Sequence, residues 1–587
     1  MTGRATAPVA IGSAGPAPVQ ATPAGRAGEP APDRMAELDR RLGDPYDDGN
    51  PVGYRAVLAA DERAELLADG ERMLDGYGLN AEFVPVAYGG RFTEADRLVR
   101  TLRSVFRRDG TLGLGYGVTN FIAGAPIWTA GDADQCRFAA DVLLRHRKMA
   151  AGYNELPRGN DFTRCELTAD RVGDQLRLTG RKQVVNNIAR ADAAVFLART
   201  SPEPGNRSHS HVLVDLTALD PARRRYLDRH HTVGLRGCQI AGVEFDGCPT
   251  PANIVGAPGE AMETVLRAFQ VTRSVLPAMA VAGLDTQLRT VLRFTRARRL
   301  YGRTLLELPH ARSVLVGAYL DLLAADCLGT VVARALHVLP AQTSVLSAAA
   351  KYLVPKLIYE ASNELAVLLG ARSYLREGPY AIFQKNLRDI PAASFTHANA
   401  AVCLATMIPQ LPRLASRSWL RADEPPAELF RLDHRLGPLD FRALELTARG
   451  VDNLSGTLPA SQPAVAGEPA LARLCAGFVA ELGRLAGRAT ELPPRGRTIA
   501  AGRGSFLLAD RYAVLLAASA CLGVWRRNRR FQADTGWLTG TLWRLADRLG
   551  HEPGPLPDGL ERRLAAELIS RADEPRGFDL AAPRLAG

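Results

Sequence analysis

The chain of 587 residues is poor in lysine, because arginine supplies almost all of its 73 basic side chains. Only five lysines occur, namely Lys148, Lys182, Lys351, Lys356 and Lys385. Arginine in place of lysine usually follows GC-rich coding, so the net charge of +11 is weak evidence for a dedicated binding surface. A basic surface nevertheless favours anionic ligands such as phosphates, acidic proteins or nucleic acid.

Cysteine clusters and long apolar runs are also missing. The eight cysteines are scattered between Cys136 and Cys521 without a CxxC pair, which argues against a disulfide scaffold and a zinc site and predicts reduced thiols. The first 32 residues contain no continuous apolar run of the kind that secretory signals need. No stretch reaches the about eighteen uncharged apolar residues of a membrane helix. We therefore expect a cytoplasmic protein with no bound metal and no membrane partner.

Changes in hydrophobic period divide the chain into five segments. An Ala/Pro/Gly-rich tail is predicted for 1–45, followed by a helical domain at 46–150. Alternating apolar residues around the Gly173-Asp174 turn predict a hairpin inside a β domain at 151–255. Apolar stripes at helical spacing, for example Leu284, Leu288, Val291 and Leu292, predict a four-helix bundle at 256–415. A polar break at about 452–468 interrupts a helical extension that runs from 416 to 587.

Six motifs stand in a fixed order between about 55 and 415. They are "VPVAYGG" (84–90), "NELPRGND" (154–161), "LTGRKQVVNN" (178–187), "GLRGCQIAGVEFDGCPTPANIVG" (234–256), "RARRLYGRTLLELPHAR" (296–312) and "LLGARSYLREGPYAIFQKNLRD" (368–389). Together they resemble the acyl-CoA dehydrogenase family. The resemblance implies a mostly α fold with a small central β domain, and it implies FAD as the cofactor.

The resemblance also assigns residues to FAD: Asn154, Gly159, Asn160, Val184, Asn186, Arg298, Tyr301, Gly370 and Asn399. Side-chain amides can hydrogen-bond the flavin ring, and a glycine lets the backbone approach it closely. An arginine fork suits the FAD pyrophosphate, and Arg298 would reach the FAD of a neighbouring subunit. The sequence departs from the family at three of these positions, because Asn154 and Asn186 replace threonine and Val184 replaces tryptophan. These changes predict an altered flavin face.

The family's catalytic carboxylate is missing. That base is a Glu or Asp eight residues beyond an Arg-Asp pair, and eight residues beyond Asp389 stands His397. Some members carry the base at the position of Thr272, next to an arginine, here Arg273, that organises the substrate thioester. We expect Arg388 and Asp389 to form an ion pair that fixes the catalytic loop. A neutral imidazole with a pKa near 6.5 is able to take the proton in place of a carboxylate.

Three functions remain open at this point. The first is oxidation of an acyl thioester, carried by coenzyme A or by an acyl-carrier protein, with His397 as the base. The second is another flavin reaction, such as oxygenation, and the third is a non-catalytic or DNA-binding role. For an oxidation, the electron acceptor would be an electron-transfer flavoprotein or oxygen. The extension resembles the extra helical domain of very-long-chain acyl-CoA dehydrogenases, which favours a homodimer, and we expect no nucleic-acid partner.

Overall fold

The computed structural model describes residues 33–396, 398–421 and 423–586. His397 therefore lies outside the described residues, as do residues 1–32 of the predicted tail. The rest of that tail prediction was wrong, because Arg34–Leu42 forms helix α1. Leu38 and Leu42 stand one helical turn apart and are both buried, so they anchor this helix to the core.

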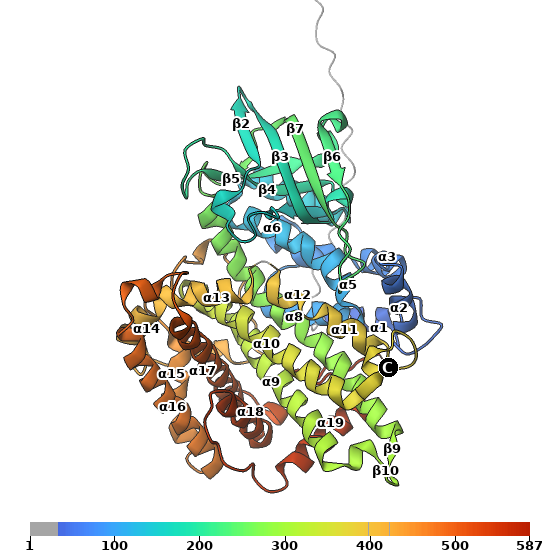
Figure 1. The fold of residues 1–587 in the computed structure, drawn as a ribbon, viewed down its shortest axis with the longest axis vertical. Helices are drawn as coiled ribbons and strands as arrows, with labels where there is room; N and C mark the ends of the chain where they lie inside the picture. The colour runs from blue at the N-terminus through green and yellow to red at the C-terminus, as the bar shows by residue number, and fades with distance from the viewer. Residues whose placement is uncertain (1–32, 397, 422, 587) are drawn as a thin grey trace, which may run out of the picture. The chain divides into compact units, whose positions relative to one another are not determined.

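The first helical region packs beneath the sheet in the view of Figure 1. Its helices are α2 (Tyr54–Glu62), α3 (Ala68–Tyr77), α4 (Ala95–Arg108), α5 (Gly110–Leu112), the π-helix η3 (Gly113–Val118), α6 (Thr119–Ala130) and α7 (Ala133–Leu144). From α5 to α6 the helical turns follow one another without a loop. Almost every residue of α6 is buried, because the helix contacts both strand β1 and helix α8. This helix thereby forms one wall between the sheet and the bundle.

An eight-stranded sheet follows, in the order β6-β7-β3-β2-β4-β5-β8, with β1 beside β4. Its strands are β1 (Met149–Gly152), β2 (Thr168–Val172), β3 (Gln175–Asn186), β4 (Ala193–Arg199), β5 (His209–Asp215), β6 (Arg224–Leu227), β7 (Ile240–Pro251) and β8 (Ile254–Val255). The predicted hairpin is confirmed: β2 and β3 pair in antiparallel register around Gly173, whose φ of +64° favours glycine. β3 therefore presents its far end, around Val184 and Asn186, to the helices.

Three long helices form the centre of the molecule (Figure 1): α8 (Ala261–Ala297), α9 (Pro309–Val338) and α10 (Thr343–Leu369). The apolar stripe predicted on α8 is fully buried. After α10 the chain forms α11 (Ile382–Asp389), α12 (Ala392–Phe395) and α13 (Ala400–Met407), and α13 packs against α10. The observed fold is thus the predicted one, mostly helical with a small central β domain.

Two of the long helices, α9 and α17 (Arg503–Arg527), are long and apolar enough to cross a membrane by length and composition alone. This differs from the expectation that no stretch is long and apolar enough to span a membrane. Within the structure 94% and 83% of their apolar windows are buried against other parts of the protein. Both helices contribute to the largest hydrophobic cluster and contact each other, so their composition is that of core helices.

The extension after α13 contains α14 (Leu411–Arg417), α15 (Asn453–Val465), α16 (Pro469–Thr490), α17, α18 (Thr535–Arg548) and α19 (Leu560–Asp573). The predicted break at 452–468 was wrong, because α15 occupies most of it despite two internal prolines. Asp452 caps this helix and accepts hydrogen bonds from the backbone N–H of Ser455 at 3.0 Å, from Trp419 at 3.0 Å and from the Tyr512 hydroxyl at 2.8 Å. One buried carboxylate thereby joins three parts of the extension.

The segment after α19 reaches a buried ion network between α4, α8 and α9. Asp579 lies 3.1 Å from Arg107 and 3.5 Å from Arg103, which itself pairs with Asp326 at 2.5 Å. The backbone N–H of Leu580 donates to Asp326. Although burial alone would raise the pKa of Asp579, Arg103 and Arg107 lower it. The positive charges of the two arginines are thus balanced in part by a carboxylate that lies far away in the sequence.

Candidate functional site

A cavity of about 130 Å³ lies where the sheet meets α6, α8 and the turn after α12. Its walls are apolar on several sides and polar where β1 and β3 end. The lining side chains include Leu114, Thr119, Ile122, Tyr153, Asn154, Phe162, Val184, Asn186, Ile240, Phe269 and Thr396. The structure therefore brings together three of the predicted flavin residues, Asn154, Val184 and Asn186.

Backbone pairing and a buried ion pair fix the polar side of this cavity. Asn154 forms an isolated antiparallel bridge with Val184, so the two face the cavity from adjacent backbones. The next residue, Glu155, pairs with Lys182 at 2.8 Å, and both side chains are almost fully buried. Against the effect of burial, Lys182 lowers the pKa of Glu155. Glu155 also accepts the backbone N–H groups of Glu166 and Leu167, so it holds the 154–165 loop against the sheet.

Two polar atoms at the cavity have no partner among the described residues. They are the hydroxyl of Tyr153 and the side-chain oxygen of Asn186, whose amide nitrogen donates to Thr119 at 2.7 Å. Buried polar atoms are normally hydrogen-bonded, so an unpaired donor and an unpaired acceptor at one cavity indicate a missing ligand. A flavin ring offers hydrogen-bond groups of both kinds and a flat apolar body. The donor set and the apolar walls therefore fit a flavin.

The cavity is smaller than the about 300–1,000 Å³ of typical small-molecule sites. Half-buried Phe162, on the short 3-10 helix η4 (Phe162–Arg164), forms part of its wall. We therefore expect the loop that carries Phe162 to move outwards when a flavin binds. Two further predicted residues, Gly159 and Asn160, lie on the same loop and do not line the cavity. Gly159 has φ +55°, a conformation that favours glycine.

Thr396, which follows α12, closes the cavity from the helical side. Thr396 lines it, and Ala398 is buried with a φ of +108°, which a residue with a side chain rarely adopts. Strained backbone of this kind is held in place by its surroundings and is frequent at functional sites. The predicted cofactor residue Asn399 instead caps α13, where its side-chain oxygen accepts the N–H of Val402 at 2.9 Å.

The Arg-Asp pair before this turn is organised differently from the prediction. Arg388 pairs with Asp61 of α2 at 2.7 Å, whereas Asp389 pairs with Lys385 at 2.6 Å. Lys385 also pairs with Asp109 at 2.6 Å, and although burial opposes it, the two carboxylates raise the pKa of Lys385. The two residues therefore do not pair with each other: Arg388 ties α11 to α2, whereas Asp389 pairs within α11 with Lys385, which in turn reaches Asp109.

Behind the cavity, α8, α10 and α13 bury two cations. Arg273 stands one turn after Phe269, and its guanidinium lies 5.4 Å from the centre of that ring. Lys351 is 1% exposed and donates to the Ala393 carbonyl at 2.6 Å. Burial lowers the pKa of Arg273 and lowers that of Lys351 to about 8. The predicted residue Thr272 is buried beside them and donates to the Phe269 carbonyl.

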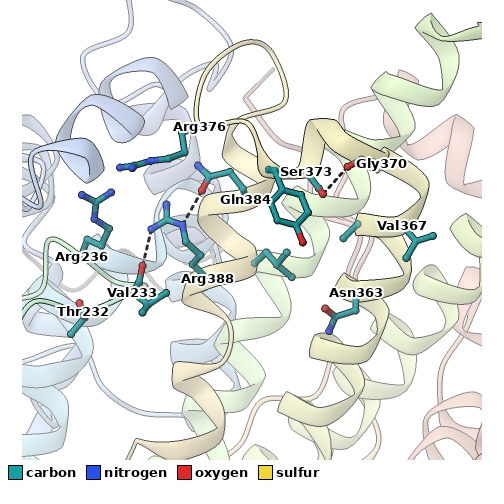
Figure 2. Close-up of a pocket in the computed structure, with 13 residues that line it drawn as sticks. Thr232, Val233, Arg236, Asn363, Val367, Gly370, Ser373, Arg376, Gln384 and Arg388 are labelled. Atoms are coloured by element: carbon teal, nitrogen blue, oxygen red, sulfur yellow. Dashed lines mark hydrogen bonds between the residues drawn. The ribbon is translucent and has the colours of Figure 1, made fainter.

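A larger cleft of about 830 Å³ lies apart from this cavity, between α10, α11 and the loop around Val233. Figure 2 shows Gly370 and Ser373 on one side of it and Arg236, Arg376 and Arg388 on the other. Each of the three arginines pairs with Asp61 or Glu62 of α2. Gly370 was predicted to contact FAD, and with φ +65° it lines this cleft rather than the cavity.

Arg298 and Tyr301 do not reach either site within one chain. Both are exposed, Tyr301 to 93%, at the hairpin of β9 (Arg299–Leu300) and β10 (Arg303–Thr304). In Figure 1 this hairpin lies at the end of α8 that is remote from the sheet. Their assignment to the FAD of a neighbouring subunit stays a prediction.

Four residues at or beside the cavity were not predicted from the sequence. Tyr153 and Lys182 stand inside or beside the quoted motifs, so the motif positions offered a signal for them. Thr119 and Phe269 offered none, because each lies on a helix whose pattern indicates only burial.

Comparisons with known proteins match this description. Residues 259–405 match the family model for the acyl-CoA dehydrogenase C-terminal domain. A probable acyl-CoA dehydrogenase, fadE25 of Mycobacterium leprae, is 22% identical over 334 residues, which is 56% of this chain and 84% of the relative. Butyryl-CoA dehydrogenase from Megasphaera elsdenii has a similar structure, with a TM-score of 0.58 and 18% identity over 64% of this chain and 97% of that one.

The prolyl acyl carrier protein oxidase AnaB likewise has a TM-score of 0.55 and 18% identity, over 63% of this chain and 95% of its own. At such identities the two solved structures show the fold alone, and about a third of this chain has no counterpart in them. The family model and the sequence relatives add evidence from the sequence itself. Over residues 259–405 the chain matches the C-terminal domain of the acyl-CoA dehydrogenases, and its sequence relatives support an FAD-dependent oxidoreductase that acts on CH–CH groups.

Proposed function

We propose that the protein oxidises an acyl thioester between Cα and Cβ, with His397 as the base that removes the α-proton. The observation that carries this proposal is the position of Thr396, which lines the cavity beside Asn154, Val184 and Asn186. His397 is the next residue in the sequence. Among the described lining residues there is no carboxylate that could serve instead.

The chemistry needs a base close to the α-carbon and a dry site. A thioester carbonyl acidifies its α-carbon, and a neutral imidazole can accept the proton at near-neutral pH. Bound FAD supplies the acceptor for the hydride that leaves the β-carbon. Asn154, Asn186 and Tyr153 would hold the flavin ring, and the apolar walls exclude water. Lys351 would keep the turn in place through the Ala393 carbonyl.

The test is anaerobic mixing of the purified protein with a panel of acyl-CoA and acyl-carrier thioesters while flavin absorbance is followed. We expect bleaching by at least one thioester, at a rate that rises with pH as the imidazole loses its proton. His397→Ala should slow bleaching by about 10²–10⁴-fold without loss of FAD. His397→Glu restores the family's carboxylate and should recover bleaching.

His310→Ala is the matched control, since His310 is exposed on α9. Full-rate bleaching by His397→Ala would remove the base assignment. Bleaching by no thioester would favour the second function, a flavin reaction such as oxygenation that needs no proton abstraction beside a carbonyl.

The carrier and the electron acceptor are part of the same proposal. The fold occurs both in a butyryl-CoA dehydrogenase and in an oxidase that acts on a carrier protein, so the panel includes both carriers. Rapid reoxidation of the bleached flavin by air would identify oxygen as the acceptor. Slow reoxidation would point to an electron-transfer flavoprotein.

We further propose that the protein acts as a cytoplasmic homodimer. Arg298 is exposed and remote from its own cavity, which is the arrangement expected of a residue that serves the partner's FAD. Arg298→Ala should release FAD more readily during gel filtration, because a pyrophosphate charge loses its arginine fork. Light scattering that gives the mass of one chain, or unchanged FAD retention, would contradict this assignment.

A further inference from the structure

A second cleft, of about 750 Å³, lies between the start of α8, the α13–α14 region and two segments of the extension. Leu266 and Thr406 line it from the bundle, and Gly450 and Thr490 line it from the extension. The volume lies within the range of sites for nucleotide-sized ligands.

Four arginines give this cleft an unbalanced positive charge. Arg413, Arg417, Arg449 and Arg497 line it, and no described lining residue is an aspartate or glutamate. Only Arg449 has a carboxylate partner within the described part of the chain, Glu445 at 2.9 Å. Within the described residues, Arg417 and Arg497 donate to backbone carbonyls only, which leaves their positive charge unbalanced. By contrast, all three arginines of the 830 Å³ cleft pair with a carboxylate, either Asp61 or Glu62. Guanidinium groups without a carboxylate partner in a concave site attract phosphates, which they can bind with two parallel hydrogen bonds.

Gly450 holds two of these arginines in position. It has φ +85°, and a Cβ added there would lie 2.7 Å from Cγ of Arg413 and 2.9 Å from Cδ of Arg417. The loop therefore packs directly on the stems of both side chains. Fixed stems lower the conformational entropy that the guanidinium groups lose when they bind an anion.

The cleft adjoins the flavin cavity along two helices. Leu266 lines the cleft and Phe269 lines the cavity, one turn apart on α8. Thr396, which follows α12, lines the cavity, and Thr406, near the end of α13, lines the cleft. The cavity and the cleft therefore lie one helical turn apart along α8.

We propose that this arginine cleft, which the extension completes, binds the phosphate end of the substrate's phosphopantetheine carrier. The inference rests on the proposed function, because it assumes a thioester in the flavin cavity. Coenzyme A and a phosphopantetheinylated carrier protein share this phosphate. The extension thus contributes to substrate recognition as well as to the core.

The experiment measures binding of coenzyme A, of pantetheine without phosphate, and of a holo-carrier protein to the full-length FAD-loaded protein. Arg413→Glu should weaken coenzyme A binding at least about tenfold, leave pantetheine binding unchanged and leave FAD in place. Arg417→Glu should act in the same direction. Arg562→Glu is the control, because it makes the same charge change at an exposed position of α19.

The outcomes separate the two proposals. If the Arg413→Glu variant loses only coenzyme A binding, the carrier is the nucleotide. If it loses only binding of the holo-carrier protein, the carrier is that protein. Either result supports a phosphate site in the cleft. Unchanged binding of both, in variants whose flavin is still bleached by thioesters, overturns the cleft and leaves the proposed function intact. If no thioester bleaches the flavin while coenzyme A binding still depends on Arg413, the proposed function fails and the phosphate site stands.

Discussion

Lys351 allows the cost of a buried cation to be measured directly. Its side chain is 1% exposed, and no described carboxylate pairs with it. Burial lowers its pKa from 10.5 to about 8. At about 1.4 kcal/mol for each pKa unit, the charged form costs the folded protein about 3 kcal/mol.

The pH dependence follows from the sign of this shift. Because the folded-state pKa lies below the unfolded value, the unfolded chain binds more protons between about pH 8 and pH 10.5. The free energy of unfolding should therefore rise with pH across that window. Lys351→Met removes the charge but leaves the Ala393 carbonyl without its donor, a loss of about 1 kcal/mol.

The variant should thus be more stable than the wild type by about 2 kcal/mol at pH 7 and less stable by about 1 kcal/mol above pH 10.5. Urea unfolding at a series of pH values measures the difference. Lys356→Met, five residues later on α10, is the control. Lys356 pairs with Asp510 at 3.1 Å, so its loss should destabilise the protein near neutral pH.

A carbon-13 NMR titration of the lysine side chains gives an independent readout, since only five signals are expected. The signal that Lys351→Met removes should titrate near pH 8. If that signal titrates near 10.5, or if the stability curves of variant and wild type stay parallel, the burial argument is refuted.

Three further predictions concern the scaffold and the charge. Glu155→Gln leaves buried Lys182 without its carboxylate, so we expect a loss of about 3–5 kcal/mol in urea unfolding and weaker FAD retention; an unchanged midpoint would contradict this. Asp452→Ala removes the acceptor of three buried hydrogen bonds and should lower the free energy of unfolding by at least about 2 kcal/mol in the same urea assay. Asp558→Ala, in an exposed loop, is the control and should leave the free energy of unfolding unchanged. DNA binding should be negligible at physiological salt, since the net charge reflects composition, and titration at two salt concentrations would reveal an affinity that contradicts this.

Motif positions predicted much of the fold and the polar half of the candidate site. Asn154, Val184 and Asn186 meet at one cavity because a strand end and the loop beside it are local structures. The pairing of Arg388 and Asp389 could not be predicted in this way. Consecutive residues on a helix point in different directions, so Arg388 reaches α2 and Asp389 reaches Lys385 on its own helix.

Long-range packing explains the remaining differences. α1 has a charged composition like that of a linker, and only the burial of Leu38 and Leu42 makes it part of the fold. The prolines of α15 predict a break, yet a buried cap at Asp452 and buried leucines keep the helix. The burial of Lys351 depends on α8, α12 and α13 together, and no local pattern encodes it.

The ion network of Asp579 has a consequence for the order in which the protein can complete its fold. Asp579 is synthesised 476 residues after Arg103 and 472 residues after Arg107. At about 5–20 residues per second, the ribosome needs roughly half a minute to a minute and a half to supply this carboxylate. During that interval α4 carries arginines that it cannot yet bury with full compensation. Its final docking against α8 and α9 is therefore a late step of folding.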